Sequence, residues 1–181
     1  MPWREALDEL ERIDEAVYRA VAATPTPALD ATLRRTSRIA DRSVLWMIIA
    51  AGLATTGPKG RRAAVSGLAS VALTSTVVNV GLKPLHHRRR PDNAEVLATP
   101  GRSVRMPGSA SFPSGHSASA FAFATAVGAE IPALGLPLRV LAAAVAYSRV
   151  HGGAHYPADT IAGSLIGGAA ATFVTRARRR S

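Results

Sequence analysis

Long hydrophobic blocks with at most one charged residue each alternate with short charged segments along most of this chain. The blocks occupy residues 43–57, 63–82, 117–129, 138–147 and 160–175. Blocks of this kind predict helices, and the second reaches the roughly 20 residues that a bilayer core requires. Because no alternating strand pattern accompanies them, we expect an all-α fold, an integral-membrane helical bundle of about five spanning helices.

The first 42 residues have a different pattern and predict an amphipathic N-terminal arm. Within residues 4–22, five apolar positions recur at helical spacing opposite acidic residues: Leu7, Leu10, Ile13, Val17 and Val21. This segment is too charged to span a bilayer. It could lie on the membrane surface, cover the bundle or contact a partner, and we expect it to cover the bundle. The predicted domains are therefore the arm, residues 1–42, and a transmembrane domain, residues 43–181.

Proline and glycine set several expected boundaries. Thr26 suits a helix N-cap, with Pro27 at the first helical position. Four residues are expected to form the turn between the third and fourth blocks: Glu130, Pro132, Gly135 and Pro137. In the last block, the spacing of Gly163 and Gly167 permits close approach of a neighbouring helix.

The charge balance narrows the class of partner. The chain has 22 Lys and Arg against 12 Asp and Glu, a formal net charge of +10, and half of its acids lie in the first fifteen positions. Such charge suits nucleic acid, anionic lipid headgroups or a phosphate substrate, and the hydrophobic blocks make nucleic acid the least favoured. The chain has no Cys, which excludes disulfides, thiolate metal sites and a Cys nucleophile. The acidic N-terminus does not resemble a cleavable signal peptide.

A long connection, residues 83–115, carries many of the cations. Its length in a compact domain favours a functional loop. Lys83 follows a full hydrophobic block, and Arg90 precedes Pro91. Four other arginines are expected only to anchor the loop at the lipid interface: Arg88, Arg89, Arg102 and Arg105. His86 and His87 are expected to be ordinary loop residues.

Two further segments supply histidines. In Pro113–His116, Ser114 suits an N-cap, Gly115 suits the turn, and the N–H groups of such a helix start can hold an oxyanion beside His116. Arg149 can grip phosphate oxygens. His155 and Asp159 are four apart and share a face if a helix starts near Pro157. His151 is expected to be structural.

Together these segments predict phosphoryl-transfer chemistry. Lys83, Arg90 and Arg149 would neutralise a phosphate, and the Ser114–Gly115 turn would donate hydrogen bonds. His155, oriented by Asp159, would attack phosphorus, and His116 would protonate the leaving oxygen. Because cations would do a metal's electrostatic work, we expect no metal and no cofactor.

The spacing of these residues resembles the type 2 phosphatidic acid phosphatase (PAP2) superfamily, which includes the vanadium haloperoxidases. Its pattern is K-x6-R-P, then P-S-G-H, then S-R-x5-H-x3-D. The matching residues are Lys83 with Arg90 and Pro91, then Pro113 to His116, then Ser148, Arg149, His155 and Asp159. The resemblance implies a helical bundle, a phosphohistidine on His155, His116 as general acid and Asp159 as the partner that orients His155. The other matched residues would bind phosphate.

The resemblance also implies a lipid phosphate substrate and a multi-pass protein of the cell membrane. A polyprenyl diphosphate or polyprenyl-linked sugar phosphate is favoured, with phosphatidic acid or phosphatidylglycerophosphate as the alternative. The basic residues 57–62 and 176–180 fall on one side, which the positive-inside rule places in the cytoplasm, so the site would face outward. Oligomeric state is left open.

Two rival hypotheses come from other classes. A metallohydrolase could use four ligands, His116, His151, His155 and Asp159, because His151 and His155 have the i, i+4 spacing of a metal site. A non-catalytic membrane protein could bind anionic lipid through its arginines alone. The complete motifs favour an enzyme over this second rival.

Overall fold

The computed structural model describes residues 2–106 and 108–180, and its elements are helices throughout those ranges. The helices are α1 (Pro2–Ala23), α2 (Pro27–Ala40), α3 (Val44–Ala54), α4 (Pro58–Thr76), α5 (Ala94–Ala98), α6 (Gly115–Glu130), α7 (Pro132–His151) and α8 (Pro157–Arg180). A short turn, η1 (Asp41–Ser43), joins α2 to α3. The π-helical stretch η2 (Val77–Leu82) and the 3-10 turn η3 (Lys83–Leu85) prolong α4. The predicted all-α fold is confirmed.

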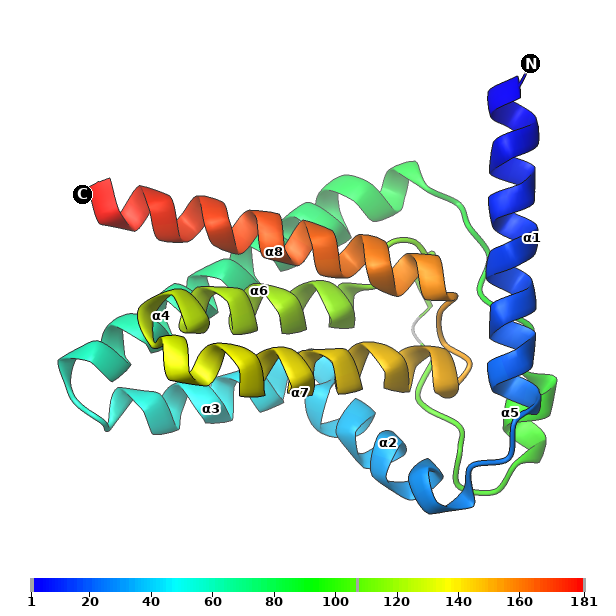
Figure 1. Cartoon of the computed structure of the whole chain (residues 1–181), viewed down its shortest axis with the longest axis horizontal. Coiled ribbons are helices and arrows are strands. Elements are labelled where there is room, and N and C mark those ends of the chain that lie inside the picture. The colour runs from blue at the N-terminus through cyan, green and yellow to red at the C-terminus, as the bar shows by residue number, and fades with distance from the viewer. Residues whose placement is uncertain (1, 107, 181) are drawn as a thin grey trace.

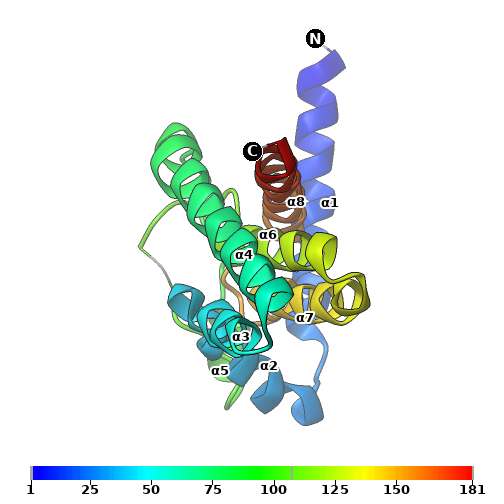
Figure 2. The same ribbon diagram turned by 90° about the vertical axis from the view of Figure 1, so that its left-hand side faces the viewer.

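Five helices, α3, α4, α6, α7 and α8, lie lengthwise beside one another, and α6 packs against α4, α7 and α8 (Figures 1 and 2). Small side chains let α6 occupy this central place, since most of its buried residues are Ala or Ser. A Cβ added at Gly167 of α8 would lie 2.1 Å from the Ala118 carbonyl oxygen of α6. The close approach predicted from the Gly163–Gly167 spacing is therefore present.

Two helical stretches among the described residues are long and apolar enough to cross a membrane, Pro58–Leu85 and Pro132–His151. They correspond to the second and fourth hydrophobic blocks. The remaining lengthwise helices coincide with the other blocks, and their crossing of the bilayer stays a prediction.

The expected turn between the third and fourth blocks is wrong in extent. Helix α7 already begins at Pro132, because proline is well suited to the first helical position. Pro137 lies inside the helix, where it removes the hydrogen bond that a backbone N–H would give to the Ala133 carbonyl oxygen. Gly135 packs α7 against α6, since a Cβ added at Gly128 would lie 2.8 Å from the Gly135 Cα. These residues therefore serve helix contact more than the turn.

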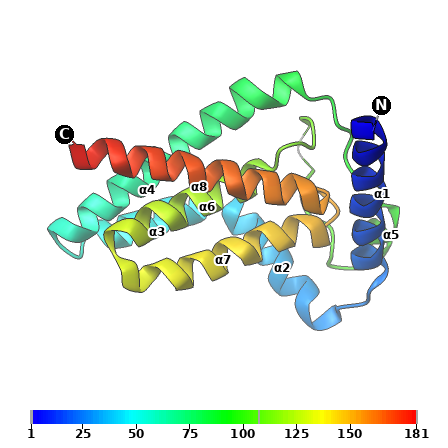
Figure 3. The same ribbon diagram turned by 45° about the horizontal axis from the view of Figure 1, so that its top comes forward.

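Helix α1 lies across the end of the bundle where α7 ends and α8 begins (Figures 1 and 3). The expectation that its apolar face covers the bundle is largely wrong. Leu7, Leu10, Ile13 and Val17 are exposed, whereas Tyr18 and Ala22 are the buried apolar residues of α1. Tyr18 and Ala22 pack with Val96 and Val150. Sequence period shows which residues share a face but not what that face contacts.

Candidate active site

His155 and Asp159 stand at the start of α8, which begins at Pro157 as predicted. The Nδ1 atom of His155 lies 3.5 Å from Asp159 Oδ2. The Ser111 hydroxyl donates to the same carboxylate oxygen at 2.5 Å and lies 3.4 Å from His155 Nδ1. The opposite ring nitrogen, Nε2, lies 3.3 Å from an Nη of Arg90. One edge of the imidazole thus faces an orienting carboxylate, and the other faces a cation.

The surroundings of His155 favour a neutral imidazole. Burial lowers the pKa of His155 to about 4; the hydrogen bond with Asp159 acts in the opposite direction, and the charges of Arg90 and Arg149 add to the lowering. A neutral ring has a free lone pair at one nitrogen. With Asp159 next to Nδ1, the lone pair is favoured at Nε2, the nitrogen that a nucleophile would use.

His116 lies in the first turn of α6, next to its predicted N-cap. Ser114 begins the helix, and its Oγ accepts from the Ser117 N–H at 3.4 Å. The Ser114 N–H donates to the Asp159 carbonyl oxygen at 2.9 Å, which ties the start of α6 to the start of α8. His116 Nε2 lies 2.8 Å from Asp41 Oδ1, in the turn η1. No pattern in the sequence predicted this pairing.

A cavity of about 270 Å³ lies between these elements. Its lining includes both histidines, His116 and His155, together with Lys83 of η3 and Gly115 of α6. The remaining lining residues are Ala40, Arg42, Ser43, Ser75, Asn79, Ser109 and Ser119. The two imidazoles predicted to share one phosphate therefore border one cavity.

Backbone and hydroxyl groups hold two of the predicted phosphate ligands. Lys83 Nζ donates to Ser109 Oγ at 3.1 Å. Arg90 donates to the carbonyl oxygens of Ser109, Ala110 and Ala154, at 3.2, 3.3 and 2.5 Å. The segment around Ser109 and the loop before His155 thus fix the Arg90 guanidinium beside His155.

Arg149 is fully buried near the end of α7. It donates to the Ser37 hydroxyl and, at 3.3 Å, to the Arg105 carbonyl oxygen. It is near enough to interact electrostatically with His116 and His155. Its Nε–H is buried and has no acceptor in the described part of the chain. A buried donor of this kind is costly unless something else accepts from it, and a phosphate oxygen would be a suitable acceptor.

The four ligands of the metallohydrolase hypothesis are not brought together. His151 Nε2 lies 3.0 Å from Asp30 Oδ1 and 2.8 Å from the Thr26 hydroxyl, at the base of α2. Across residues 2–106 and 108–180, no group of three or more His, Asp or Glu side chains is placed to hold a metal ion. His151 instead joins α7 to the arm, the structural role that was expected.

Two arginines that were expected to be lipid anchors have other roles. Arg102 is 2% exposed, and it donates to four carbonyl oxygens, those of Val21, Ala22, Thr24 and His151. Arg88 forms ion pairs with Asp159 and with Asp14 of α1, each at 2.7 Å. The lipid-anchor interpretation is wrong for both. The concentration of acids in the arm of a basic chain indicated that the arm would pair with cations. Nothing in the sequence indicated which cations these would be.

Comparison with known protein families identifies the superfamily of this chain. The sequence model of the PAP2 superfamily matches residues 63–181. The chain belongs to the PAP2 superfamily. This result confirms the resemblance inferred from the three motifs, all of which lie within the matched residues.

Individual PAP2 proteins are similar over nearly the whole chain. Decaprenylphosphoryl-5-phosphoribose phosphatase of Mycobacterium tuberculosis is 34% identical over 179 residues, covering 93% of this chain and 97% of that protein. The protein of the same name from Mycolicibacterium smegmatis is 31% identical over 165 residues, covering 87% and 84%.

Solved structures support the membrane bundle fold. The transmembrane PAP2-type phosphatidylglycerolphosphate phosphatase of Bacillus subtilis has a TM-score of 0.75 at 23% identity, covering 95% of this chain and 87% of that one. LpxE of Aquifex aeolicus has a TM-score of 0.72 at 22% identity, covering 89% and 93%. At these identities the likeness concerns the fold.

Proposed function

We propose that this PAP2 protein is a lipid phosphatase that removes the phosphate of a polyprenyl-phosphate-linked sugar phosphate. One observation carries the proposal: His116, His155, Lys83 and Gly115 border a single cavity in a chain of the PAP2 superfamily. The substrate class rests on the relatives named for a decaprenylphosphoryl phosphoribose, which are similar over most of the chain.

The proposed reaction proceeds in two steps. Nε2 of His155 attacks phosphorus, the bond from phosphorus to the sugar oxygen breaks, and His116 gives that oxygen its proton. Water then attacks the phosphohistidine with His116 as base, which releases inorganic phosphate and restores His155.

The predicted phosphate ligands would stabilise charge in both steps. Lys83, Arg90 and Arg149 are cations positioned beforehand by protein groups, so little reorganisation accompanies the reaction. The Ser114 N–H already donates to the Asp159 carbonyl oxygen, and the Ser114 hydroxyl oxygen accepts from Ser117. The O–H of Ser114 and the first N–H groups of α6, beginning at Gly115, would donate to the phosphate.

Asp41 and Asp159 would have different functions in this scheme. Asp159 keeps the proton of His155 on Nδ1, so that Nε2 is free to attack. Asp41 accepts from the ring of His116. Burial lowers the pKa of His116 to about 4, and the hydrogen bond and charge of Asp41 act in the opposite direction, toward the protonated form that a general acid needs.

We also propose that the site faces the extracytoplasmic side of a multi-pass protein. The α3–α4 turn and the C-terminus lie at the end of the bundle away from α1 and the start of α8 (Figure 1). That end carries Arg61 and Arg62 and the basic tail of α8. Positive charge of this kind marks the cytoplasmic side.

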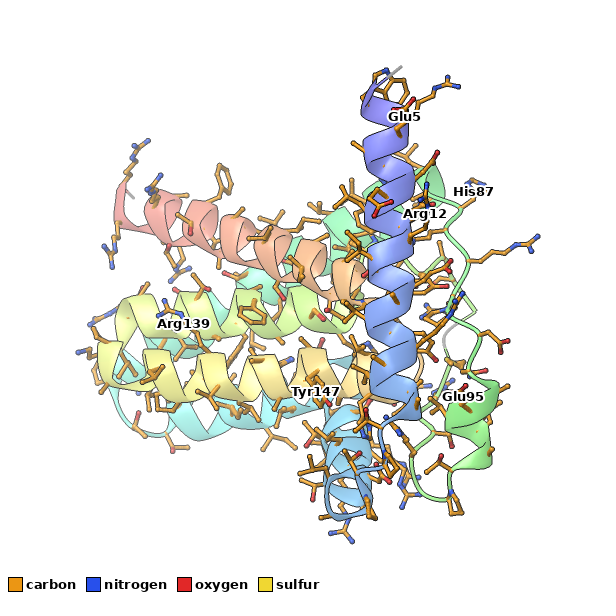
Figure 4. The ribbon with its side chains drawn as sticks, turned by 45° about the vertical axis from the view of Figure 1, so that its right-hand side comes forward. Glu5, Arg12, His87, Glu95, Arg139 and Tyr147 are labelled. Carbon is orange, nitrogen blue, oxygen red and sulfur yellow. The ribbon has the colours of Figure 1, made fainter. Side chains whose placement is uncertain are left out.

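Phosphate release from purified protein in detergent tests the proposal. The substrates are decaprenylphosphoryl phosphoribose, a polyprenyl diphosphate, phosphatidic acid and phosphatidylglycerophosphate. We expect the first to have the highest kcat/KM, and His155→Ala to abolish release. His87→Ala is the matched control, because His87 is an exposed residue on the outer side of its loop (Figure 4). Full activity of His155→Ala would contradict the mechanism, and a preference for a glycerolipid would contradict the substrate.

A further inference from the structure

Arg88 connects the N-terminal arm to the centre of the site. Its Nη1 donates to Asp159 Oδ1 at 2.7 Å, and its Nη2 donates to Asp14 Oδ2 at 2.7 Å. The side chains of Asp159 and Asp14 are 0% and 7% exposed, and that of Arg88 is 22% exposed. A charge-assisted bridge this far from water is held more firmly than a surface ion pair.

The two oxygens of Asp159 have separate partners. Oδ1 accepts from Arg88, whereas Oδ2 faces His155 and accepts from the Ser111 hydroxyl and, at 2.9 Å, from the Tyr156 N–H. Rotation of the carboxylate would break bonds on both sides. Arg88 therefore helps to fix the oxygen that His155 Nδ1 meets.

Asp14 also has a partner for each oxygen. Oδ2 accepts from Arg88, and Oδ1 accepts from the Ala158 N–H at 2.8 Å. Ala158 lies in the first turn of α8, where backbone N–H groups have no partner within the helix. Asp14 thus caps α8 from another helix while it holds Arg88 (Figure 4 shows α1 across this end).

Aromatic rings fix the guanidinium from the side. Arg88 Cζ lies 4.4 Å from the centre of the Tyr156 ring, within the range of a cation–π contact. Tyr18 of α1 packs edge-on against Tyr156 at 5.6 Å and donates to the Asp92 carbonyl oxygen at 2.9 Å. These contacts leave Arg88 little freedom to turn toward the cavity.

We propose that Arg88 and Asp14 are positioning residues of the active site, which act through Asp159 to orient His155. The inference rests on the proposed function, in which His155 is the nucleophile. Arg88 keeps Asp159 ionised and in place, and Asp14 holds Arg88 by the opposite end of its guanidinium. The series of contacts that leads from α1 to the nucleophile consists of Asp14, Arg88, Asp159 and His155.

The contacts argue against Arg88 as one more phosphate ligand. Both terminal nitrogens of Arg88 already donate to carboxylates, whereas Arg90 and Arg149 donate to carbonyl and hydroxyl oxygens. Removing a phosphate ligand would raise KM as well as lower kcat. Removing a positioning residue would chiefly lower kcat.

The test compares Arg88→Gln and Asp14→Asn with wild type. We expect Arg88→Gln to lower kcat by about 10- to 100-fold, as for other groups that orient a histidine, with KM changed less than about threefold. Asp14→Asn keeps an oxygen for the Ala158 N–H but loses the charge that holds Arg88, so a smaller loss is expected. The double variant should be no slower than Arg88→Gln alone, because Asp14 acts through Arg88.

A pH profile distinguishes positioning from general loosening of the structure. His155 faces Arg90 and Arg149, Asp159, and His116 across the cavity. Removal of the Arg88 charge leaves the carboxylate of Asp159 less compensated, so the coupled pair binds a proton more readily. We expect the acid limb of kcat/KM to move up by about one pH unit in Arg88→Gln. Arg88→Lys keeps the charge but not the two-sided geometry of the guanidinium. It should therefore restore the wild-type position of the acid limb more fully than the wild-type kcat.

Matched controls are Arg89→Gln, an exposed neighbour in the same loop, and Glu11→Gln, an exposed acid of α1. Both should match wild type. Wild-type kcat and an unmoved acid limb in folded Arg88→Gln, or additive losses in the double variant, would overturn the proposal. If Arg88→Gln does not fold, Asp14→Asn decides alone through the same kcat and pH readouts. Failure of the proposed function itself would look different, because wild type would then release no phosphate or His155→Ala would remain active.

Discussion

Gly163 offers a direct test of how helix packing sets the site. It lies in α8, one turn after Asp159, and faces the start of α6. A Cβ added there would lie 2.4 Å from the Ser114 carbonyl oxygen and 3.3 Å from the Ala118 backbone nitrogen. Ordinary contact begins at 3.4 Å, so Gly163→Ala requires the two helix starts to separate by about 1 Å.

That separation has a calculable consequence. Overpacking of this kind costs about 1–3 kcal/mol, and alanine returns roughly 1 kcal/mol of helix propensity over glycine, so the net loss of stability is up to about 2 kcal/mol. The midpoint of thermal unfolding should fall by about 5 °C for a chain of this size. Because His116 moves with Ser114 and His155 with α8, a misplacement of about 1 Å should also lower kcat by about 100-fold.

Gly168→Ala is the matched control, since the nearest atom to its added Cβ is the Thr125 hydroxyl at 4.0 Å. We expect it to leave kcat unchanged and the unfolding midpoint equal or higher. The assays are thermal unfolding in detergent and phosphate release from decaprenylphosphoryl phosphoribose. If Gly163→Ala and Gly168→Ala give the same midpoint and rate, helix contact at Gly163 does not set the geometry of the site.

Three further predictions concern the arm, pH and metals. Arg102→Ala should destabilise the protein by about 3 kcal/mol or more in thermal unfolding, because it leaves buried carbonyl oxygens without donors, whereas exposed Arg139→Gln should change little. Burial lowers the pKa of His155 to about 4 in the folded protein, whereas in the unfolded chain it is about 6.5. Between these pH values the imidazole of His155 is protonated in the unfolded chain and neutral in the folded protein. Stability measured by unfolding should therefore fall as pH decreases through that window, less steeply in His155→Gln, and an equal slope in that variant would refute this assignment. EDTA should leave phosphate release intact, and vanadate should inhibit it. If EDTA abolishes activity and added metal restores it, the metallohydrolase hypothesis would be favoured instead.

Much of the fold could be predicted because its signals are local. Hydrophobic blocks indicated the lengthwise helices, and Pro27 and Ser114 indicated two helix starts. The spacing of Gly163 and Gly167 indicated the contact of α8 with α6. The catalytic and phosphate-binding roles were predicted from motif spacing, and the cavity that His116 and His155 share is consistent with them. These roles stay predictions until variants are assayed.

What could not be predicted depends on pairs far apart in the chain. Arg88 meets Asp14 across 74 positions, and His116 meets Asp41 across 75. Neither a helical period nor a motif states which acid a given cation will meet. In the sequence, Arg88 is therefore indistinguishable from the exposed arginines beside it, and only the folded structure shows that α1 lies next to it.

Apart from Asp159, the acids that bond to the site and to the end of α7 lie ahead of the residues that match the superfamily. Asp14 bonds to Arg88, Asp30 to His151 and Asp41 to His116, whereas the superfamily match begins at residue 63. A chimera that joins residues 63–181 to a foreign leader would keep Arg88, His116 and His151 but lose these three acidic partners. A graft between relatives should be active only when the residues that carry Asp14, Asp30 and Asp41 are transferred together with residues 63–181. The N-terminal residues therefore belong to the smallest segment that can be transferred as an active enzyme.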